Sequence, residues 1–485
     1  MKKILLTLLL LAAVTADDQF DRVRDFIRKQ MVERGVPSVA VAVARDGRII
    51  WEEGFGWADR ENRVATTPHT TYSLASISKP ITATGLMILK ERGLVDLDRP
   101  VNDYLGEAKV KVRLGSPADA TVRRVANHTA GLPLHYQFFY ADEPYRAPTR
   151  DETILRYANT VTAPGEKYQY SNLGYGIIDY VIARASGKSY AEFMRTEVFV
   201  PLGLTRTSVD VGPGLEKHQA VRYGADGLPI PFYDFDHPGG SAVYASAHDL
   251  VRFGMFHLKA RLPDQKAILS DAGIDEMQRA TVETGKDQGY GVGWATALHP
   301  GGRRSFSHSG GMGGVATQLR LFPAEKIAIV VLTNSSSPLP GLVVEEIIAT
   351  LMPGAERRPT PPPPPAAETA FKPPSQLLGA WKGSLHTYRG EIPLTLEFKE
   401  SGDVHARLGT QLKTLVNRAD FKDGYLTGSF LGDVGTEDVN RRPYTLSLTL
   451  KLRGDALNGA VTALSLPGQR VGNALSHWAE LKKQP

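Results

Sequence analysis

The sequence predicts an α+β protein, in which an antiparallel sheet is flanked by helices and accompanied by a helical subdomain, followed by a small all-β barrel-like domain. Three observations lead to this prediction. Strand patterns occur at both ends of residues 17–352, with helical patterns between them. A proline-rich segment comes next. After that segment only short alternating strands follow, which is typical of a barrel or sandwich.

The length and the first residues predict the domain organisation. A chain of 485 residues with 42% hydrophobic and 22% charged residues is long enough for two or three globular domains. Residues 1–16 combine lysines, a short apolar run and small residues before the expected cut, which is typical of a secretory signal peptide. We therefore expect export to the periplasm or the extracellular space. The apolar run is too short to span a bilayer.

The composition excludes several classes of function. The formal net charge is +5, and two of these charges belong to Lys2 and Lys3 of the leader, which leaves +3. That charge is small and evenly spread, so nucleic acid is not an expected partner. The chain has no cysteine, which excludes disulfides, thiolate metal sites and cysteine catalysis. We expect no metal site, because the histidines are scattered: His69, His128, His135, His237, His308, His386 and His405.

The main domain, residues 17–352, begins with a helix and two strands. Residues 17–34 carry apolar side chains at helical spacing, and Gly35 is expected to cap that helix. Residues 38–44 and 49–55 read as strands joined by a hairpin turn.

The centre of the main domain is predicted to be helical and rich in loops. Helices are expected at 174–184, 190–198 and 247–259. The loops 134–145 and 232–237 are rich in aromatic residues, which more often pack than bind but could wall a cleft.

The main domain ends in strands and a helix. Residues 305–309, 316–322 and 327–333 alternate as strands, and 342–352 read as a helix. Because strands occur at both ends of this domain, we expect its two ends to share one sheet.

The clearest boundary is the linker, residues 353–374, which contains an unbroken run from Pro361 to Pro365. The segment after it, 375–485, is predicted to be a β-rich domain without a catalytic motif. Its expected strands are 391–400, 403–408, 425–430, 444–453 and 456–464.

Ser76 and Lys79 form a Ser-x-x-Lys motif at the start of a predicted buried helix that ends at Gly93. Pro80 must lie in the first turn, so Ser76 is at or just before the helix start. Residues three apart share a helix face, and the helix N-terminus favours an oxygen that gains negative charge. A lysine with a lowered pKa could take the serine proton. The motif alone is weak, since an N-cap serine and a solvated lysine are the simpler alternative.

Tyr170 and Asn172 lie in Tyr-Ser-Asn, just before a predicted helix. A phenol beside an ammonium would lose its proton more readily and could pass protons between nucleophile, lysine and leaving group. The amide of Asn172 could hold both Lys79 and a substrate carbonyl. The alternative is a helix cap with a packed tyrosine.

His308, Ser309, Gly310 and Gly311 end a predicted strand. Glycines at a strand edge let a substrate approach closely, and the N–H of Gly311 could complete an oxyanion hole with that of Ser76. The alternative is a plain strand end with a surface histidine.

In this order, the three motifs resemble the serine penicillin-recognising family: class C β-lactamases, D-Ala-D-Ala carboxypeptidases, D-aminopeptidases and esterases of the same fold. The resemblance covers about residues 17–352 and includes Asn127–Pro133 and Gly239-Gly240-Ser241. It implies a serine acyl-enzyme mechanism. The proline spacer and β-rich tail resemble members in which a lipocalin-like domain covers or restricts the active site.

One position departs from the family pattern. Dedicated β-lactamases and carboxypeptidases usually carry Lys-Thr-Gly where this chain has His308-Ser309-Gly310. A histidine holds a substrate carboxylate with less fixed charge, and the His form is commoner in the family's esterases and aminopeptidases.

We therefore predict an exported serine hydrolase without metal or other cofactor. Ser76 is the expected nucleophile, Lys79 and Tyr170 take its proton, and Asn172, His308, Gly310 and Gly311 bind substrate or assist. The expected substrates are small esters or D-residue peptides. The alternatives are a β-lactamase or D-Ala-D-Ala carboxypeptidase, and a catalytically idle protein that binds peptide or peptidoglycan.

Overall fold

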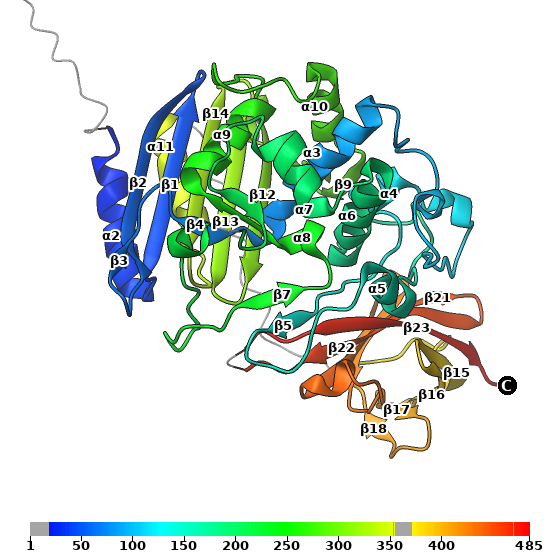
Figure 1. The fold of residues 1–485 in the computed structure, drawn as a ribbon. Coiled ribbons are helices and arrows are strands. Elements are labelled where there is room, and N and C mark those ends of the chain that lie inside the picture. Colours follow the sequence, from blue (N-terminus) through cyan, green and yellow to red (C-terminus); the bar gives the residue numbers. More distant parts are fainter. Residues whose placement is uncertain (1–18, 213, 353, 355–370, 469) are drawn as a thin grey trace, which may run out of the picture.

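The structure is a computed structural model that describes residues 19–212, 214–352, 354, 371–468 and 470–485 (Figure 1). The predicted signal peptide, residues 1–16, lies outside the described residues, and so does most of the predicted linker. The described chain forms a larger part of mixed helix and sheet and a smaller all-β part, as expected for the predicted α+β class (Figure 1).

A nine-stranded antiparallel sheet runs through the larger part, in the order β3-β2-β1-β14-β13-β12-β11-β10-β9. The N-terminal strand β1 pairs with β14, the last strand of this part, so the two ends share one sheet as predicted. The strands are β1 (Ser38–Arg45), β2 (Arg48–Asp59), β3 (Val64–Ala65), β9 (Val282–Gly285), β10 (Gln288–Tyr290), β11 (Ala295–Leu298), β12 (Arg304–Met312), β13 (Val315–Phe322) and β14 (Ile327–Thr333).

Helices cover both faces of this sheet. On one face lie α2 (Asp21–Arg34) and α11 (Leu339–Leu351), which bury the valines of β1 (Figure 1). On the other face α9 (Ala247–His257) packs closely, since a Cβ on Gly254 would meet the side chains of Leu321 and Ala328 at 2.9 and 3.0 Å. Valine and alanine alternate along β1, so the larger valines face α2 and α11, whereas the smaller alanines face the side on which α9 packs closely.

The remaining helices and short strands form the helical subdomain and its connections. The predicted helix at 190–198 begins as α7 and continues as a π-helical segment, η4. The helices and strands of the helical subdomain and its connections are β4 (Thr71–Ser73), η1 (Ala75–Ile77), α3 (Ser78–Glu91), η2 (Val101–Asp103), η3 (Pro117–Asp119), α4 (Val122–Ala126), β5 (Phe138–Tyr140), α5 (Arg150–Tyr157), α6 (Asn172–Ser186), α7 (Tyr190–Phe193), η4 (Met194–Phe199), β6 (Thr207–Val209), η5 (Glu216–His218), β7 (Tyr233–Phe235), α8 (Pro238–Ser241), β8 (Val243–Ser246), α10 (Asp271–Gln278) and η6 (Pro300–Gly302). Within the described ranges, no helix combines the length and apolar character that crossing a membrane requires.

The smaller part is a nearly closed antiparallel barrel of nine strands in the order β18-β17-β16-β15-β23-β22-β21-β20-β19. All five strands that the sequence predicted are present, and β15, β18, β19 and β23 were missed. Residues 474–479 of β23 read Ala-Leu-Ser-His-Trp-Ala, so apolar and polar residues do not alternate there, although all six are buried. The elements are β15 (Gly379–Thr387), β16 (Gly390–Phe398), β17 (Val404–Leu408), β18 (Thr414–Leu415), β19 (Asn417–Lys422), β20 (Tyr425–Phe430), η7 (Val439–Arg441), β21 (Tyr444–Arg453), β22 (Ala456–Ser465) and β23 (Ala474–Lys483).

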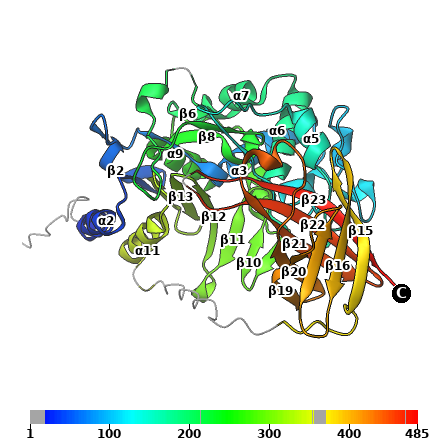
Figure 2. The ribbon, with the colours of Figure 1, turned by 90° about the horizontal axis from the view of Figure 1, so that it is seen from below.

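The barrel packs directly against the larger part (Figures 1 and 2), and Figure 1 shows β5 next to β22 and β23. Tyr136 and Ala474 form an isolated antiparallel bridge, with backbone N–O distances of 3.1 and 2.9 Å. The hydroxyl of Ser476 donates to the carbonyl of Leu134 at 2.6 Å. The aromatic-rich loop 134–145 is therefore covered by the start of β23, a contact that brings the barrel close to the predicted site.

Candidate active site

Ser76 lies in a strained turn directly before α3. Its neighbour Ala75 has φ +48°, in the left-handed region that costs energy for a residue with a Cβ. The backbone of Leu74 holds this turn in place, because its N–H donates to Val243 at 2.9 Å and its carbonyl accepts from Thr317 at 3.0 Å. Ser76 is half-buried between fully buried neighbours. The turn therefore leaves Ser76 partly exposed between buried residues.

Lys79 is completely buried in the first turn of α3. Its Nζ is 3.0 Å from Ser76 Oγ, 2.8 Å from Asn172 Oδ1 and 2.9 Å from the carbonyl oxygen of Gly240. Burial lowers the pKa of Lys79 well below its ordinary value. A neutral amine has two hydrogens, which the two pure acceptors Asn172 and Gly240 use. Its lone pair is then left for the proton of Ser76.

Tyr170 lies close to both Lys79 and Ser76. Its ring centroid is 4.7 Å from Lys79 Nζ. Burial raises the pKa of Tyr170, although a hydrogen bond with Ser76 opposes that rise. The pKa of Tyr170 is thus raised and not lowered as expected, because the loss of hydration on burial outweighs the contribution of its neighbours. Tyr170 therefore keeps its proton and is suited to donate one.

Asn172 is the first residue of α6, whose N-cap is Ser171. The Ser171 hydroxyl accepts from the N–H of Gly174 at 3.1 Å, so the predicted helix cap is also present. The amide of Asn172 donates to the carbonyl of His135 at 3.1 Å, which directs its oxygen towards Lys79. The capped helix start thus fixes one of the acceptors that hold the lysine.

His308 is buried on β12, so the alternative of a surface histidine is wrong. With its Nδ1–H donating to the carbonyl of Ser309 at 2.8 Å, its Nε2 accepts from the Tyr290 hydroxyl at 3.0 Å. Burial, with the nearby Lys79, lowers the pKa of His308 to about 3. The ring is therefore neutral in the physiological range and offers no fixed charge.

Gly310 allows β12 to lie against the Ser76 turn. A Cβ at this position would be 2.1 Å from the carbonyl oxygen of Leu74 and 2.3 Å from Thr317 Oγ1. At Gly311 the corresponding position has nothing within 4 Å. The backbone of Gly311 therefore borders open space at the strand edge.

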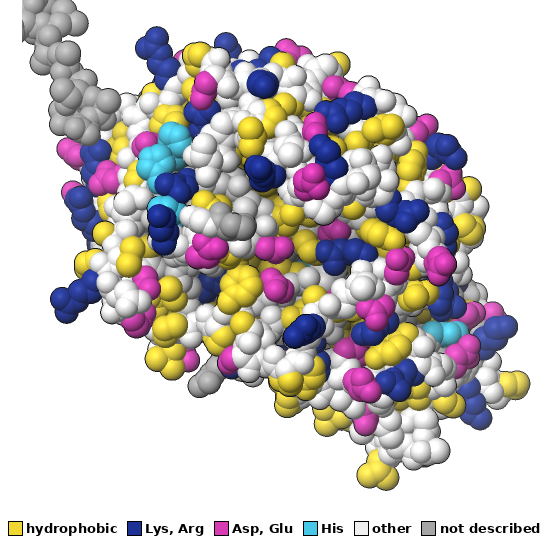
Figure 3. Space-filling model, in the orientation of Figure 1, with side chains coloured by type: hydrophobic (Ala, Val, Ile, Leu, Met, Phe, Trp, Pro, Cys, Tyr) yellow, Lys and Arg dark blue, Asp and Glu magenta, His cyan; other side chains and the backbone are white. Residues whose placement is uncertain are grey.

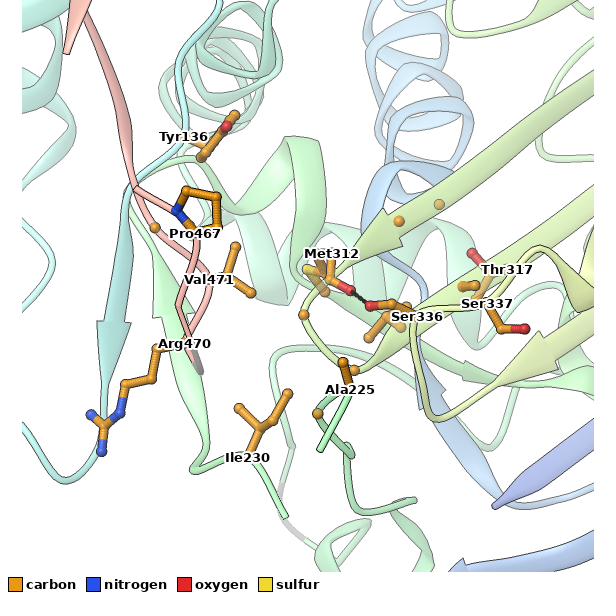
Figure 4. Close-up of a pocket in the computed structure, with 18 of the residues that line it drawn as sticks. Tyr136, Ala225, Ile230, Met312, Thr317, Ser336, Ser337, Pro467, Arg470 and Val471 are labelled. Carbon is orange, nitrogen blue, oxygen red and sulfur yellow. Dashed lines mark hydrogen bonds between the residues drawn. The ribbon is translucent and has the colours of Figure 1, made fainter. Parts of the chain in front are cut away.

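That open space is a cavity of about 800 Å³ between the larger part and the barrel (Figure 4). Its lining includes residues 309–318 of the larger part and, facing them, barrel residues 464–468 and 470–473. Figure 4 shows Val471 and Pro467 of the barrel facing Met312 across the cavity, with Tyr136 beside them.

Two smaller cavities flank the same region. One, of about 330 Å³, is lined by Tyr170 and His308 among others. The other, of about 270 Å³, lies between loop residues 161–169 and strands β21 and β22. Leu464 of the barrel lines both this cavity and the large one. The end of β22 therefore borders two cavities, one of which also contains Gly310 and Gly311.

Sequence reasoning assigned no role to His128, which lies in the Asn127–Pro133 motif. His128 has φ +63° and accepts from the N–H of Ser171 at 3.2 Å through Nδ1. Its ring lies 4.4 Å from that of Tyr170, centroid to centroid. Burial and the nearby Lys79 lower its pKa well below the ordinary value. A neutral His128 thus positions Tyr170, a role that only the folded contacts reveal.

Gly240 was quoted only as part of a glycine signature, and its carbonyl proves to be an acceptor for Lys79. A buried network holds its helix, α8. Asp236 accepts from His135 and from His237, both at 2.7 Å. Burial would raise the pKa of Asp236, but the two histidines hold it well below its usual range. Both Asp236 oxygens are occupied by these hydrogen bonds, so we interpret the group as structural.

Residues 23–349 match the family model described as Beta-lactamase. The chain is 27% identical over 322 residues to penicillin-binding protein 4* of Bacillus subtilis, which covers 61% of this chain and 67% of that protein. It is 29% identical over 329 residues to the unguisins hydrolase ungD' of Aspergillus campestris, covering 64% and 60%. The chain thus spans about two thirds or less of these relatives' lengths.

Two solved structures share the fold. The octameric penicillin-binding protein homologue from Pyrococcus abyssi has a TM-score of 0.60 at 23% identity, covering 95% of this chain and 99% of that one. A class C beta-lactamase has a TM-score of 0.62 at 20% identity, covering 70% and 98%. The first likeness extends over both the sheet-containing part and the barrel.

Proposed function

Because this chain belongs to the beta-lactamase family, we propose that it is an exported serine hydrolase that acts by acyl transfer on small esters or D-residue peptides. The observation that carries the proposal is the placement of Lys79. Its Nζ is 3.0 Å from Ser76 Oγ, and its other two partners are acceptors only. This arrangement suits an amine that accepts the serine proton.

In the first half of the reaction, Ser76 Oγ attacks the substrate carbonyl carbon as its proton passes to Lys79 Nζ. The oxyanion accepts from the N–H groups of Ser76 and Gly311. When the bond to the leaving group breaks, Tyr170 gives its phenolic proton to the leaving atom. The Lys79 ammonium then reprotonates Tyr170, which restores both groups and leaves Ser76 acylated.

In the second half, a water molecule takes the place of the leaving group. Tyr170 and Lys79 remove its proton, the water oxygen attacks the acyl carbon, and Ser76 Oγ leaves with a proton returned from Lys79. Asn172 holds the lysine in place through both halves. No metal or organic cofactor enters these steps.

The substrate class follows from His308. Its ring is neutral and both nitrogens are engaged by Tyr290 and Ser309. The His308 side chain therefore offers a carboxylate next to the scissile bond no fixed positive charge, which favours esters and peptides without such a carboxylate. One relative is named as a hydrolase of unguisins. β-Lactams and D-Ala-D-Ala peptides are the second candidates.

We assign the domains as a signal peptide at 1–16, a hydrolase domain at 17–352, a linker at 353–374 and a lipocalin-like domain at 375–485. The last domain limits substrate size, because residues 464–468 and 470–473 line the cavity opposite Gly311. Export rests on the signal-like sequence of residues 1–16.

A covalent probe tests the proposal. A fluorophosphonate should label the wild-type protein on Ser76 and should not label a Ser76→Ala variant. A Ser78→Ala variant is the matched control, since Ser78 is a buried neighbour whose hydroxyl accepts from the N–H of Val243. An unlabelled wild-type protein would support the idle binding protein instead.

The substrate class is tested by a panel of p-nitrophenyl butyrate, D-alanine p-nitroanilide and nitrocefin. We expect the ester or the D-alanine anilide to have the highest kcat/KM. Faster turnover of nitrocefin would instead identify a β-lactamase.

A further inference from the structure

We propose that Glu52, His69 and His248 form a binding site for a divalent transition-metal ion, with Zn²⁺ as the ion that best fits this donor set. These residues come from β2, from the loop before β4 and from the N-terminal turn of α9. The sequence predicted no metal site because its histidines are scattered. The fold brings two histidines, His69 and His248, together with Glu52 outside the Ser76 site.

The geometry supplies three donors at one point on the surface. One ligand atom of each residue lies within 4.8 Å of the other two. The rings of His69 and His248 are 4.7 Å apart, and His248 Nδ1 is 2.8 Å from Glu52 Oε2. Figure 3 shows histidine side chains (cyan) gathered on the side of the molecule where β2 and α9 lie.

Small movements would complete the coordination. Zn²⁺ takes nitrogen and carboxylate oxygen at about 2.0–2.2 Å, so tetrahedral ligands lie about 3.4 Å apart. His69 is exposed and can turn inwards by about 1 Å without disturbing the core. The hydrogen bond between His248 and Glu52 would open slightly and be replaced by two bonds to the ion. Two histidines and one carboxylate leave a fourth position for water.

The local charges favour a cation. The hydrogen bond with His248 lowers the pKa of Glu52, so this carboxylate is ionised near neutral pH. Asp249 adds negative charge beside His248, while Arg252 opposes it from one turn further along α9.

Binding would tie together segments that are distant in sequence. The N–H of His248 already donates to the carbonyl of Pro68 at 3.1 Å, which joins α9 to the loop that carries His69. This loop leads into β4 and then to the Ser76 turn. An ion would therefore stabilise the folded state around that turn without taking part in the chemistry.

The test is isothermal titration of ZnCl₂ into the full chain after removal of metals with a chelator, together with the melting temperature. We expect one Zn²⁺ per chain and a higher Tm with Zn²⁺. His69→Ala and His248→Ala should each weaken binding at least about tenfold and abolish the Tm shift. His69 is exposed, so its variant should fold.

A matched control is His386→Ala. His386 also lies near a carboxylate, 3.3 Å from Glu391, but among the described residues it belongs to no group of three possible metal ligands. This variant should bind Zn²⁺ as the wild type does. The proposal is overturned if the wild type takes up no Zn²⁺, or if His69→Ala binds it as tightly as the wild type.

Discussion

The two sides of the large cavity are built from different interactions. On the Ser76 side, uncharged hydrogen bonds and close packing fix every group, as the contacts of Lys79 and Gly310 show. On the barrel side, charged pairs at the surface hold the wall in place: Arg470 with Asp142, Arg442 with Glu143, and Arg453 with Glu166. Buried contacts are stiff and insensitive to salt, whereas exposed ion pairs are weak and screened.

We infer from this difference that the Ser76 side determines the chemical step, whereas the barrel side determines which substrates reach it. Removing a group on the Ser76 side leaves buried polar partners unsatisfied, which costs about 1–3 kcal/mol each and displaces reacting atoms. Removing an ion pair on the barrel side costs about 0–1 kcal/mol. We therefore expect changes on the first side to alter turnover of every substrate, and changes on the second to alter selection among substrates.

The largest effect is expected for Lys79→Met, which removes the base and keeps most of the buried volume. We expect kcat/KM for p-nitrophenyl butyrate to fall by about 10³-fold or more. Lys90→Met is the control, since Lys90 lies on the same helix and pairs with Glu276 at the surface. Equal losses in both variants would contradict the role of Lys79.

Gly310→Ala should be next in size. The added Cβ meets the carbonyl of Leu74 at 2.1 Å, so β12 must move away from the Ser76 turn. We expect kcat to fall by about 10²-fold and the free energy of unfolding by about 1–3 kcal/mol. Gly285→Ala on the edge strand β9 meets nothing within 4 Å and should leave both quantities unchanged. Full activity of Gly310→Ala would show that the close approach is dispensable.

The pH dependence of kcat/KM should reflect the protonation of Lys79. Only the unprotonated amine accepts the serine proton, so kcat/KM should rise about tenfold per pH unit up to the lowered pKa of Lys79 and then level off. His308, with a pKa of about 3, is already neutral over this range. A His308→Gln variant that lost the rise would assign it to the histidine instead.

The same shift predicts a pH-dependent stability. The unfolded chain binds a proton at Lys79 that the folded chain does not, between the lowered pKa and the ordinary value of 10.5. The free energy of unfolding should therefore increase with pH across that window, and Lys79→Met should lack this contribution. Urea unfolding at several pH values measures the slope.

The smallest effect is expected on the barrel side. Arg470→Ala breaks the pairs with Asp142 and Glu143, which hold one end of the wall that contains Val471. We expect KM to change by a few-fold for bulky acyl groups and not for acetyl esters, with the difference shrinking at high salt. Arg389→Ala, which breaks an exposed pair with Glu437 within the barrel, is the control. An equal change in KM for all substrates would show that the barrel side of the cavity does not select among them.

Much of the architecture could be predicted from local patterns. The strands of the central sheet are apolar or alternating runs bounded by turn residues, and the proline-rich segment separates two kinds of pattern. Strand β23 was missed because contacts from both the barrel core and the larger part bury it on both faces. The barrel's contact with the site could not be predicted, since residues 464–473 carry no motif.

The sequence alone determined that Ser76 and Lys79 share a helix face, because helix geometry fixes the spacing of residues three apart. Only the tertiary structure determined the pKa values of the site residues. The acceptors that hold Lys79 lie 93 and 161 residues away in the chain, and the burial that lowers its pKa and raises that of Tyr170 comes from packing. The proximity of Glu52, His69 and His248 likewise arises from contacts between segments that are distant in the sequence. Local spacing is fixed by the backbone, whereas desolvation and long-range contacts exist only once the chain has folded.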